Sequence, residues 1–403
     1  MMKKLLFISW DADTSNYLES LFFPIFDGIQ QQAHFQIHIL QFSWADKEEV
    51  MRIQNIASSK NLIFNHHKIT KGKFQKLAVL YAVYKGVFAI KNYIENHDIQ
   101  IIMPRSTMPA MMCNRLSDWI KRKKIKIIFD ADGLPLEERI DFAGLKSTDL
   151  QYRLLKKEET KLLHHADHVL VRTLKAKEIH LQNLNAQKET KFSVVTNGRD
   201  PSFFNFKTEN KNQIRAKLGL NEDTKLFFYS GTIGPQYALD EMIAIFEAYW
   251  KTNKNTSFIL LTRRPELVEN HIPEDLKAVI YPIATDFDQI PKYLAAADLA
   301  FSLRLPAPSL AGIAPIKLGE YLLMGIPTMA SAAVGDTESM LKSSDFCHIY
   351  QHNDPERIPK AMNWINQLKS NREEIIHFGQ ENFSLNLSIT QYLKVLNAQS
   401  LTS

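Results

Sequence analysis

The chain has 403 residues, more than one ordinary hydrophobic core holds, and this length predicts two domains of roughly 200 residues each. Apolar residues make up 45% and charged residues 23%, as in soluble globular proteins. The net charge of +5 is too small to indicate a nucleic-acid-binding face, so we expect no nucleic-acid partner. Cys113 and Cys347 form no metal or redox motif, and the first residues resemble no export signal. We therefore expect a protein of the reducing cytoplasm.

Short apolar runs alternate with longer amphipathic segments along the chain. The runs are continuously apolar, which favours parallel strands covered on both faces. The strand candidates are Lys4–Ser9, Phe35–Phe42, Ile99–Met103, Lys126–Asp130, His168–Arg172 and Phe192–Thr196, then Lys225–Tyr229, Ser257–Leu261, Ala278–Tyr281, Leu299–Leu303, Thr328–Ser331 and His348–Tyr350. Helical patterns between them include Gln151–His165, Ala238–Trp250, Phe287–Ala297 and Pro355–Leu368. This alternation, repeated in two halves, predicts an α/β protein of two doubly wound, Rossmann-like parallel-sheet domains.

Polar stretches around residues 185–215 indicate the domain boundary. We predict a first domain over residues 1–190, a second over 191–380, and a C-terminal segment over 381–403. The last segment contains an amphipathic helix, Asn382–Asn397, which we expect to pack back onto the first domain.

Lysines flank an apolar and aromatic segment over residues 77–90. They are Lys71, Lys73, Lys76, Lys85 and Lys91, and a second basic run occupies residues 121–124. Two interpretations stay open: a buried helix with solvated lysines at its edges, or a helix resting on an anionic membrane surface. A transmembrane helix is disfavoured because Lys85 interrupts the apolar run.

The segment Ala314–Pro327 predicts a short helix with function in its first turns. Pro315 suits the first helical position, and Gly325 suits the position just past the end. Lys317 and Glu320 are three residues apart and share one face. The helix N-terminus and the Lys317 ammonium attract phosphate, and the Glu320 carboxylate can accept from the two hydroxyls of a ribose. The segment therefore indicates a nucleotide or nucleotide-sugar site, with a solvated ion pair as the alternative.

A loop with two glycines, Gly231-Thr232-Ile233-Gly234, follows the first strand candidate of the second half. Its glycines permit close approach to a ligand at the carboxyl edge of the sheet, although a plain tight turn is an alternative. Neither half carries G-x-G-x-x-G after its first strand, so no dinucleotide cofactor is expected. His66, His67, His164, His165 and His168 lack a partner set of carboxylates or cysteines, so no metal is expected either.

Several motifs of the second half, taken in order, resemble those of the retaining GT-B glycosyltransferases of family 4, in particular bacterial capsule, lipopolysaccharide and cell-wall transferases. The match covers roughly residues 165–345, and the block from residue 315 to 327 is its most specific part. The matching pieces are Val195–Asp200 with Phe203, Phe228–Gly231 with Leu239–Glu241, Ile290–Asp298, Pro315–Tyr321, Gly325–Pro327 and Gly335–Asp336. In the first half, Asp130–Gly133 followed by Glu137–Arg139 looks like a subfamily segment.

The resemblance implies a donor nucleotide sugar in the second domain, an acceptor in the first, and a cleft between them. It also implies that Glu320 holds the ribose and that the loop at residues 231–234 lies beside the diphosphate. The chain departs from the family at Gly312, where most members carry a glutamate that contacts the donor sugar. It also has Thr232, Gln236 and Tyr237 where many members carry basic residues.

The charge missing from the glycine loop must be replaced if a diphosphate leaves. Lys317 is the first candidate, followed by Arg263 and Arg304, which follow predicted strands at their carboxyl ends. Asn197 is a cleft contact or a simple turn residue, and Tyr281 with Ile283 forms a base pocket or a core strand end. The full donor set is Glu320, Gly231, Thr232, Ile233, Gly234, Arg263, Arg304, Asn197, Tyr281, Ile283 and Pro315, with Lys317 as the catalytic cation.

In the first domain, polar residues follow several strand candidates at their carboxyl ends. A carboxylate such as Asp132 could orient an acceptor hydroxyl or take its proton late, although an Asp turn or helix cap is the alternative. We list Asp132 and Arg105 as catalytic candidates. The acceptor-binding candidates are Trp10, Asp11, Ser106 and Asp130.

Together these features predict a hexosyltransferase that moves a sugar from a nucleotide-sugar donor to a hydroxyl of a glycan or lipid-linked glycan, with retention. Surface polysaccharide, capsule or lipopolysaccharide synthesis in the cytoplasm, with peripheral contact to the inner membrane surface, fits this activity. The rival interpretations are a nucleotide-sugar epimerase of GT-B form and a non-catalytic scaffold for glycan assembly.

Overall fold

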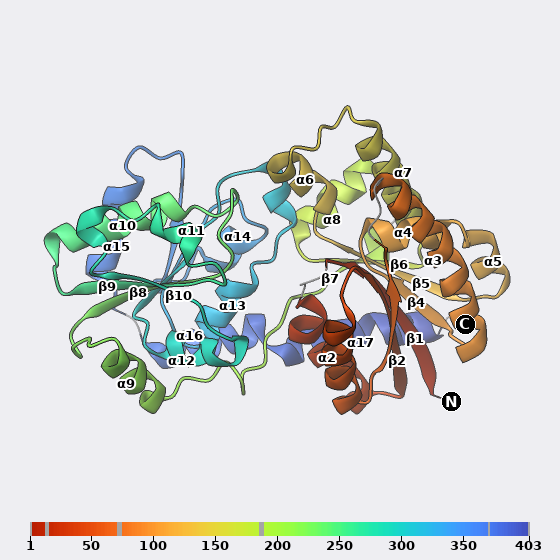
Figure 1. The fold of residues 1–403 in the computed structure, drawn as a ribbon, viewed down its shortest axis with the longest axis horizontal. Helices are drawn as coiled ribbons and strands as arrows, with labels where there is room; N and C mark the ends of the chain where they lie inside the picture. The colour runs from red at the N-terminus through yellow and green to blue at the C-terminus, as the bar shows by residue number, and fades with distance from the viewer. Residues whose placement is uncertain (1, 13–15, 71–74, 185–188, 370, 402–403) are drawn as a thin grey trace. The chain divides into compact units, whose positions relative to one another are not determined.

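The computed structural model describes residues 2–12, 16–70, 75–184, 189–369 and 371–401. The chain divides into two units (Figure 1). Unit 1 comprises residues 1–196 and 388–403, and unit 2 comprises residues 197–387. The predicted boundaries at 190 and 380 fall a few residues before these two crossings.

Unit 1 is built on a parallel sheet with the strand order β3-β2-β1-β4-β5-β6-β7. Because β1 pairs with β2 on one side and with β4 on the other, the winding reverses between β1 and β4. Ligands of doubly wound sheets bind at the carboxyl ends of strands beside such a reversal. The strands are β1 (Lys3–Asp11), β2 (Phe35–Ser43), β3 (Ile63–Lys68), β4 (Ile101–Pro104), β5 (Lys126–Asp132), β6 (His168–Val171) and β7 (Phe192–Val194).

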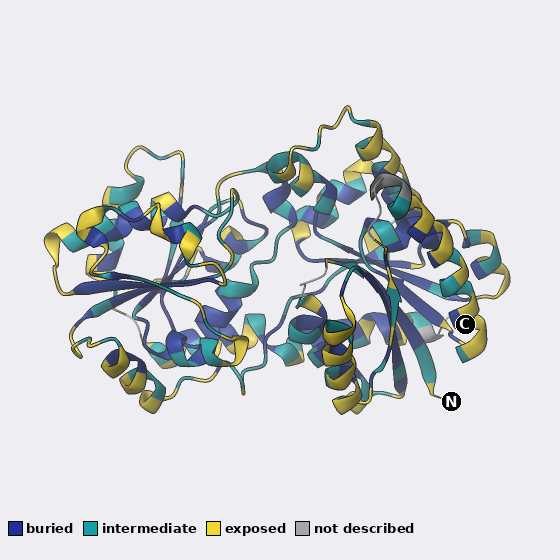
Figure 2. Cartoon of the chain, viewed as in Figure 1, coloured by how far each residue is buried: buried dark blue, intermediate teal, exposed yellow. Residues whose placement is uncertain are grey.

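Helices cover both faces of the unit 1 sheet, so its strands are largely buried (Figure 2). Side chains of Asp46 and Thr173 accept hydrogen bonds from backbone amides in the first turns of α2 and α8, and so fix where these helices begin. The helices are η1 (Leu18–Phe22), α1 (Phe23–Gln32), α2 (Lys47–Ser59), α3 (Gln75–His97), α4 (Thr107–Asn114), α5 (Ser117–Arg122), α6 (Pro135–Ala143), α7 (Leu150–His165), α8 (Leu174–Asn183), η2 (Glu189–Lys191) and most of α17 (Leu385–Leu401).

The C-terminal helix α17 returns to unit 1, as predicted. The Gln391 side chain accepts a hydrogen bond of 2.7 Å from the Thr196 backbone amide. Ile389 packs on Gly28 of α1, where a β-carbon would overlap it. The absence of a side chain at Gly28 thus lets the last helix lie against α1.

Unit 2 repeats the same winding with the strand order β10-β9-β8-β11-β12-β13, which reverses between β8 and β11. Successive residues of β8 face opposite cores: Phe227 belongs to one apolar cluster and Phe228 to another. The strands are β8 (Lys225–Ser230), β9 (Thr256–Leu261), β10 (Ile280–Ile283), β11 (Leu299–Ser302), β12 (Thr328–Ser331) and β13 (Cys347–Tyr350). The helices are α9 (Thr208–Lys217), α10 (Leu239–Thr252), α11 (Glu266–Glu269), η3 (Glu274–Leu276), η4 (Phe287–Gln289), α12 (Ile290–Ala295), η5 (Pro308–Gly312), α13 (Ile316–Leu323), α14 (Thr337–Leu341), α15 (Arg357–Gln367) and α16 (Arg372–Phe383).

All twelve predicted strands are present, and the two Rossmann-like parallel sheets are confirmed. One described strand, β3, was not predicted, because it lies at the sheet edge and exposes polar residues such as Asn65 instead of forming an apolar run. The predicted helix Asn382–Asn397 is wrong at its start. The chain breaks at Ser384, where Arg199 pairs with the backbone: its amide donates to Phe383 and its carbonyl accepts from Leu385.

Pro315 is also placed differently from the prediction. It is the extended residue before α13 rather than the first helical residue, and α13 begins at Ile316. Gly325 does end the helix in the left-handed conformation, with φ of +69°, as expected for a glycine at this position. No helix among the described residues combines the length and apolarity needed to cross a membrane.

Candidate active site

Several of the predicted donor residues of unit 2 gather beside the reversal between β8 and β11. The loop with Gly231 leaves the carboxyl end of β8, and Arg304 follows the carboxyl end of β11. The first turn of α13 reaches the same place, because the Lys317 side chain lies against Gly231. This is the crevice in which doubly wound sheets bind their ligands.

Gly231 makes room for the Lys317 ammonium. A β-carbon at Gly231 would stand 2.5 Å from Lys317 Nζ and 2.8 Å from the hydroxyl of Tyr229. That hydroxyl donates a hydrogen bond of 2.8 Å to the Thr232 carbonyl and holds the loop in place. The glycine is therefore required by the approach of lysine to the loop, in addition to any approach of a ligand.

Lys317 is a cation held in an unfavourable environment. Burial, together with the nearby Arg304 and Arg199, lowers the pKa of its amine to about 8, although Glu320 opposes the shift. Lys317 makes no side-chain hydrogen bond or ion pair with another described residue. A desolvated ammonium beside two guanidinium groups is stabilised by an anionic ligand.

Glu320 is buried, with 4% of its surface exposed, and it pairs with Arg199. The Arg199 Nε and Nη2 atoms donate to the same oxygen, Oε1, at 2.9 and 2.8 Å. The guanidinium also lies 6.0 Å from the ring centres of Phe204 and Phe287. The alternative of a solvated Lys317–Glu320 ion pair is therefore wrong. Arg199 fixes the Glu320 carboxylate and leaves its Oε2 without a hydrogen bond to a described residue.

Arg304 is anchored by residues that follow the glycine loop. Its Nη1 donates to the Gln236 side chain at 2.9 Å, and its guanidinium lies 4.9 Å from the ring centre of Tyr237. Its backbone amide donates to Ser331 Oγ, which is 2.8 Å from His352 Nε2. Gln236 and Tyr237 thus position an arginine that follows another strand, β11.

The other donor candidates fall into two groups. Asn197 Nδ2 donates to the Ala314 carbonyl at 3.3 Å and so ties the start of unit 2 to the turn before Pro315. Gly234 closes the glycine loop, since its carbonyl accepts from Tyr237. Of the remaining candidates, Arg263 is exposed, Ile233 packs on one apolar core, and Tyr281 and Ile283 of the edge strand β10 pack on the other.

Unit 1 carries a cluster of charged side chains at the carboxyl ends of β4, β5 and β6. Arg105 Nη2 lies 2.6 Å from Asp132 Oδ2, and Arg172 Nη2 lies 2.6 Å from Asp130 Oδ2. Asp130 is fully buried, whereas the Asp132 side chain is 29% exposed and its backbone is left-handed, with φ of +63°. Asp130 is therefore a supporting residue of the cluster, not the direct acceptor contact that we expected.

Aromatic rings and the first loop surround this cluster. The Arg105 guanidinium lies 4.7 Å from the ring centre of Phe22, and Tyr392 of α17 interacts with Arg172. Asp11 accepts hydrogen bonds from Ser9 and Gln41 at the end of β1, beside β4.

The other two acceptor candidates are held by neighbouring elements. Trp10 stacks on Phe42 and is half-buried. The Ser106 amide donates to the Asp130 carbonyl, and Ser106 precedes α4 with a left-handed backbone.

Three residues of these clusters were not predicted: Arg199, Arg172 and Tyr392. Arg172 lies directly after β6, but the strand candidate His168–Arg172 included it, so the rule that selected Arg304 did not find it. Arg199 lies inside the Asn197–Asp200 motif, but nothing in the sequence pairs it with a glutamate more than a hundred residues later. Across the described part of the chain, no group of three or more histidine, cysteine or acidic residues is arranged to hold a metal ion.

No protein-family model matches the chain, and no curated protein matches it in sequence. Its structure is nevertheless similar to solved structures over almost its whole length. They include HepE of Anabaena in complex with UDP and glucose (TM-score 0.70, 14% identity, 98% of this chain and 100% of that one). They also include sucrose-phosphate synthase of Thermosynechococcus elongatus (0.70, 14%, 100% of both chains).

A third similar structure is the lipopolysaccharide outer core galactosyltransferase WaaB (TM-score 0.66, 13% identity, 98% of this chain and 99% of that one). At such identities the likeness establishes architecture, and these neighbours are GT-B glycosyltransferases. With its two parallel-sheet units of matching winding, the chain has the GT-B fold.

Proposed function

We propose that this chain is a glycosyltransferase that transfers a hexosyl group from a nucleotide-sugar donor to a hydroxyl of a glycan acceptor. The observation that carries the proposal is the Lys317 ammonium, lying on Gly231 at the reversal of the unit 2 sheet with Arg304 and Arg199 beside it. Three cations face one buried carboxylate there, an excess of positive charge that suits a diphosphate.

The chemistry asks for stabilisation of the leaving group rather than for a covalent intermediate. The bond between the anomeric carbon and the phosphate oxygen breaks, and negative charge develops on the diphosphate. Lys317 and Arg304 neutralise that charge, while the carboxylate of Glu320, oriented by Arg199, accepts hydrogen bonds from the ribose hydroxyls.

The acceptor oxygen forms the new bond to the anomeric carbon on the same face. Because this is the face that the diphosphate leaves, the configuration at the anomeric carbon is retained. The proton of the acceptor hydroxyl passes to the departing phosphate oxygen. The proposal of retention rests on the resemblance of residues 315–327 to the family 4 enzymes. Position 312 is a glycine in this chain, so a glutamate does not contact the donor sugar from there.

For the acceptor we propose the charged cluster of unit 1. Asp132 is partly exposed and is held by Arg105, so its carboxylate can accept a hydrogen bond from a sugar hydroxyl. HepE was crystallised with UDP and glucose, and WaaB is named as a lipopolysaccharide galactosyltransferase. The ligand of HepE supports a nucleotide-sugar donor for this chain, and the name of WaaB supports a surface-glycan acceptor. We propose that the synthesis takes place on the cytoplasmic side.

We also propose that unit 1 contacts an anionic membrane through α3. Leu80, Tyr81, Tyr84 and Phe88 form one stripe along this helix, and each is between 51% and 61% exposed. A helix that only packs into a core would bury these side chains. The opposite face of α3 packs on the sheet, so the helix is buried on one side and exposes this stripe on the other.

Basic residues border the stripe. Lys85 lies 4.8 Å from the ring centre of Tyr81, and Lys91 lies 5.6 Å from the ring of Trp119 on α5. The exposed residues 121–124, all basic, follow at the end of α5. Lys71 and Lys73, and the side chain of Lys76, lie outside the described part of the structure. Aromatic side chains beside lysines are typical of surfaces that rest on anionic headgroups.

Vesicle sedimentation tests the membrane contact. Vesicles containing phosphatidylglycerol should retain the protein, and vesicles of phosphatidylcholine alone should not. The double variant Tyr84→Ser/Phe88→Ser should lose retention, whereas Leu174→Ser, which removes an equally exposed leucine from α8, should keep it. Equal retention of the two variants would refute the role of α3.

The activity itself is tested by incubating the purified protein with a panel of nucleotide sugars, with and without glycan acceptors. A transferase releases nucleoside diphosphate in the presence of an acceptor, and NMR of the product gives the anomeric configuration. An epimerised donor sugar without acceptor would instead establish the epimerase. Absence of turnover and of nucleotide binding would leave the scaffold interpretation and overturn the proposal.

A further inference from the structure

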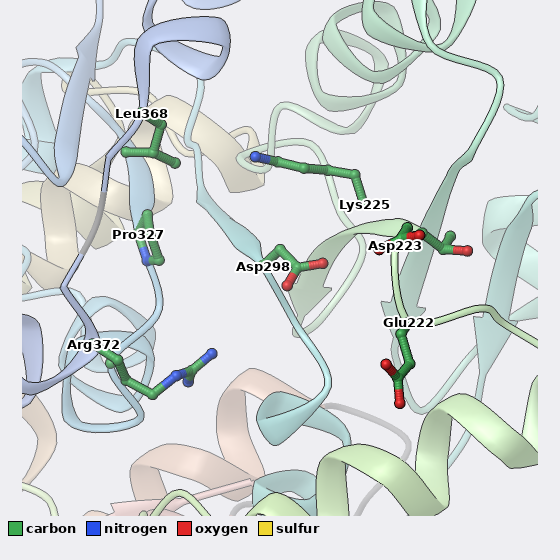
Figure 3. Close-up of a pocket in the computed structure, with 9 residues that line it drawn as sticks. Glu222, Asp223, Lys225, Asp298, Pro327, Leu368 and Arg372 are labelled. Carbon is green, nitrogen blue, oxygen red and sulfur yellow. The ribbon is translucent and has the colours of Figure 1, made fainter.

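Unit 2 has a polar pocket at the amino ends of its strands, whereas Lys317 lies near their carboxyl ends. Figure 3 shows the residues that line the pocket. Its volume is about 360 Å³, within the range of small-molecule sites. Lys225 begins β8, Asp298 immediately precedes β11, and Pro327 immediately precedes β12, so the pocket lies at the amino ends of these strands. It is therefore separate from the candidate donor site, which lies at their carboxyl ends.

Two cations face this pocket. Lys225 is half-buried and makes no side-chain hydrogen bond or ion pair with another described residue. Arg372 donates from Nη1 to the Met324 carbonyl at 2.7 Å and lies 4.0 Å from the ring centre of Phe206. These contacts fix the guanidinium and leave its Nε and Nη2 without a hydrogen bond to another described residue.

Burial weakens the solvation of both cations. It lowers the pKa of Lys225 and of Arg372, and Asp298 opposes the change in each case. The carboxylate of Asp298 is itself engaged, since its Oδ2 accepts from Arg215 at 2.6 Å and from the Leu226 amide at 2.8 Å. It therefore does not neutralise the pocket cations by direct contact.

The other two acidic residues of the pocket wall, Glu222 and Asp223, are exposed. Figure 3 shows Glu222 extending away from Lys225, whose side chain reaches toward Pro327 and Leu368. Water screens such exposed carboxylates, so they reduce the attraction of an anion without occupying the space between the cations.

We propose that this pocket binds the phosphate group of a small ligand. Phosphate presents several acceptor oxygens to Lys225 and to the free nitrogens of Arg372, and charge-assisted hydrogen bonds of this kind are the strong ones. It also replaces the solvation that both cations lose in the fold. The remaining volume accommodates a small organic group esterified to the phosphate.

The test is calorimetric titration with inorganic phosphate at low ionic strength. All proteins carry Lys317→Met, which removes one cation of the candidate donor site, and no nucleotide is used. Any phosphate that Arg304 and Arg199 still bind there is common to all the proteins, so the comparison of Lys225 variants reports on the polar pocket. The result is thus independent of whether the chain is a glycosyltransferase. Three additional substitutions are compared: Lys225→Met, Lys225→Arg, and the control Lys251→Met, which removes an exposed lysine on α10.

Lys225→Met should weaken phosphate binding by about tenfold or more, the loss expected for one charge-assisted hydrogen bond. Lys225→Arg keeps the charge and should retain binding, as should Lys251→Met. Thermal melts show whether each variant is folded. If Lys225→Met and Lys251→Met bind phosphate equally, or if the Lys317→Met protein binds none, the proposal is overturned.

Discussion

Replacing Lys317 with methionine tests whether the ammonium on Gly231 serves catalysis rather than stability. Methionine is unbranched and nearly as long as lysine, so it can follow the same path over the glycine, but it carries no charge. We expect sugar transfer to slow by roughly 10²–10³-fold, as when one donor to a developing anion is removed. We also expect the folded protein to become more stable.

The gain in stability follows from the lysine pKa. Burial, together with Arg304 and Arg199, lowers the pKa from 10.5 to about 8, although Glu320 opposes the change. Each pH unit between folded and unfolded pKa values corresponds to about 1.4 kcal/mol, so the buried ammonium destabilises the fold by at most about 3.5 kcal/mol. This destabilisation is fully present below pH 8 and disappears as the pH rises through 10.5, where the unfolded chain also loses the proton.

Urea unfolding at pH 7 and at pH 10.5 measures the effect directly. At pH 7 the Lys317→Met protein should have the higher free energy of unfolding, and the difference from the wild type should shrink at pH 10.5. Initial rates of nucleoside diphosphate release give the activity. A variant that turns over at the wild-type rate would refute the catalytic role. A variant that gains no stability at pH 7 would refute the electrostatic reasoning.

Three other substitutions test the neighbouring contacts. Arg199→Gln leaves the buried Glu320 carboxylate without its ion pair and should reduce the free energy of unfolding by about 3–5 kcal/mol; an unchanged melting temperature would contradict this. Gly231→Ala places a β-carbon against the Lys317 amine and should raise the KM for the donor, with little change in the circular dichroism spectrum. An unchanged KM would show that the amine does not hold the donor. Asp132→Asn tolerates the left-handed backbone and should slow transfer by about 10²-fold without altering nucleoside diphosphate affinity; wild-type transfer rates would exclude this carboxylate from acceptor binding.

The strands were predictable from the sequence because parallel strands buried on both faces are continuously apolar. Lys225–Ser230 and Leu299–Ser302 show this pattern, and their fully buried residues pack on both sides of the sheet. The edge strand Ile63–Lys68 escaped because an edge strand has only one neighbour and keeps polar side chains such as Asn65 exposed. The break at Ser384 escaped because a backbone pairing with Arg199, far away in sequence, decides it.

The candidate site was only partly predictable. Lys317, Arg304 and Gly231 could be chosen because each belongs to a helix start or a strand end that reaches the crevice. The Arg199–Glu320 pair could not be found, because it depends on a tertiary contact between the first residues of unit 2 and α13. Tyr281 was a candidate wall of a base pocket, with a core strand end as the alternative. It packs on an apolar core and lies on the edge strand β10, two strands away from β8.

The central claim is that the Lys317 amine holds the diphosphate of a nucleotide. Its most direct test is an NMR titration of the lysine side chains with and without a saturating nucleoside diphosphate, with the Lys317 signal assigned from its loss in Lys317→Met. We predict that this signal titrates near pH 8 in the free protein and at a distinctly higher pH in the complex. An identical pKa in the free and saturated protein would contradict it.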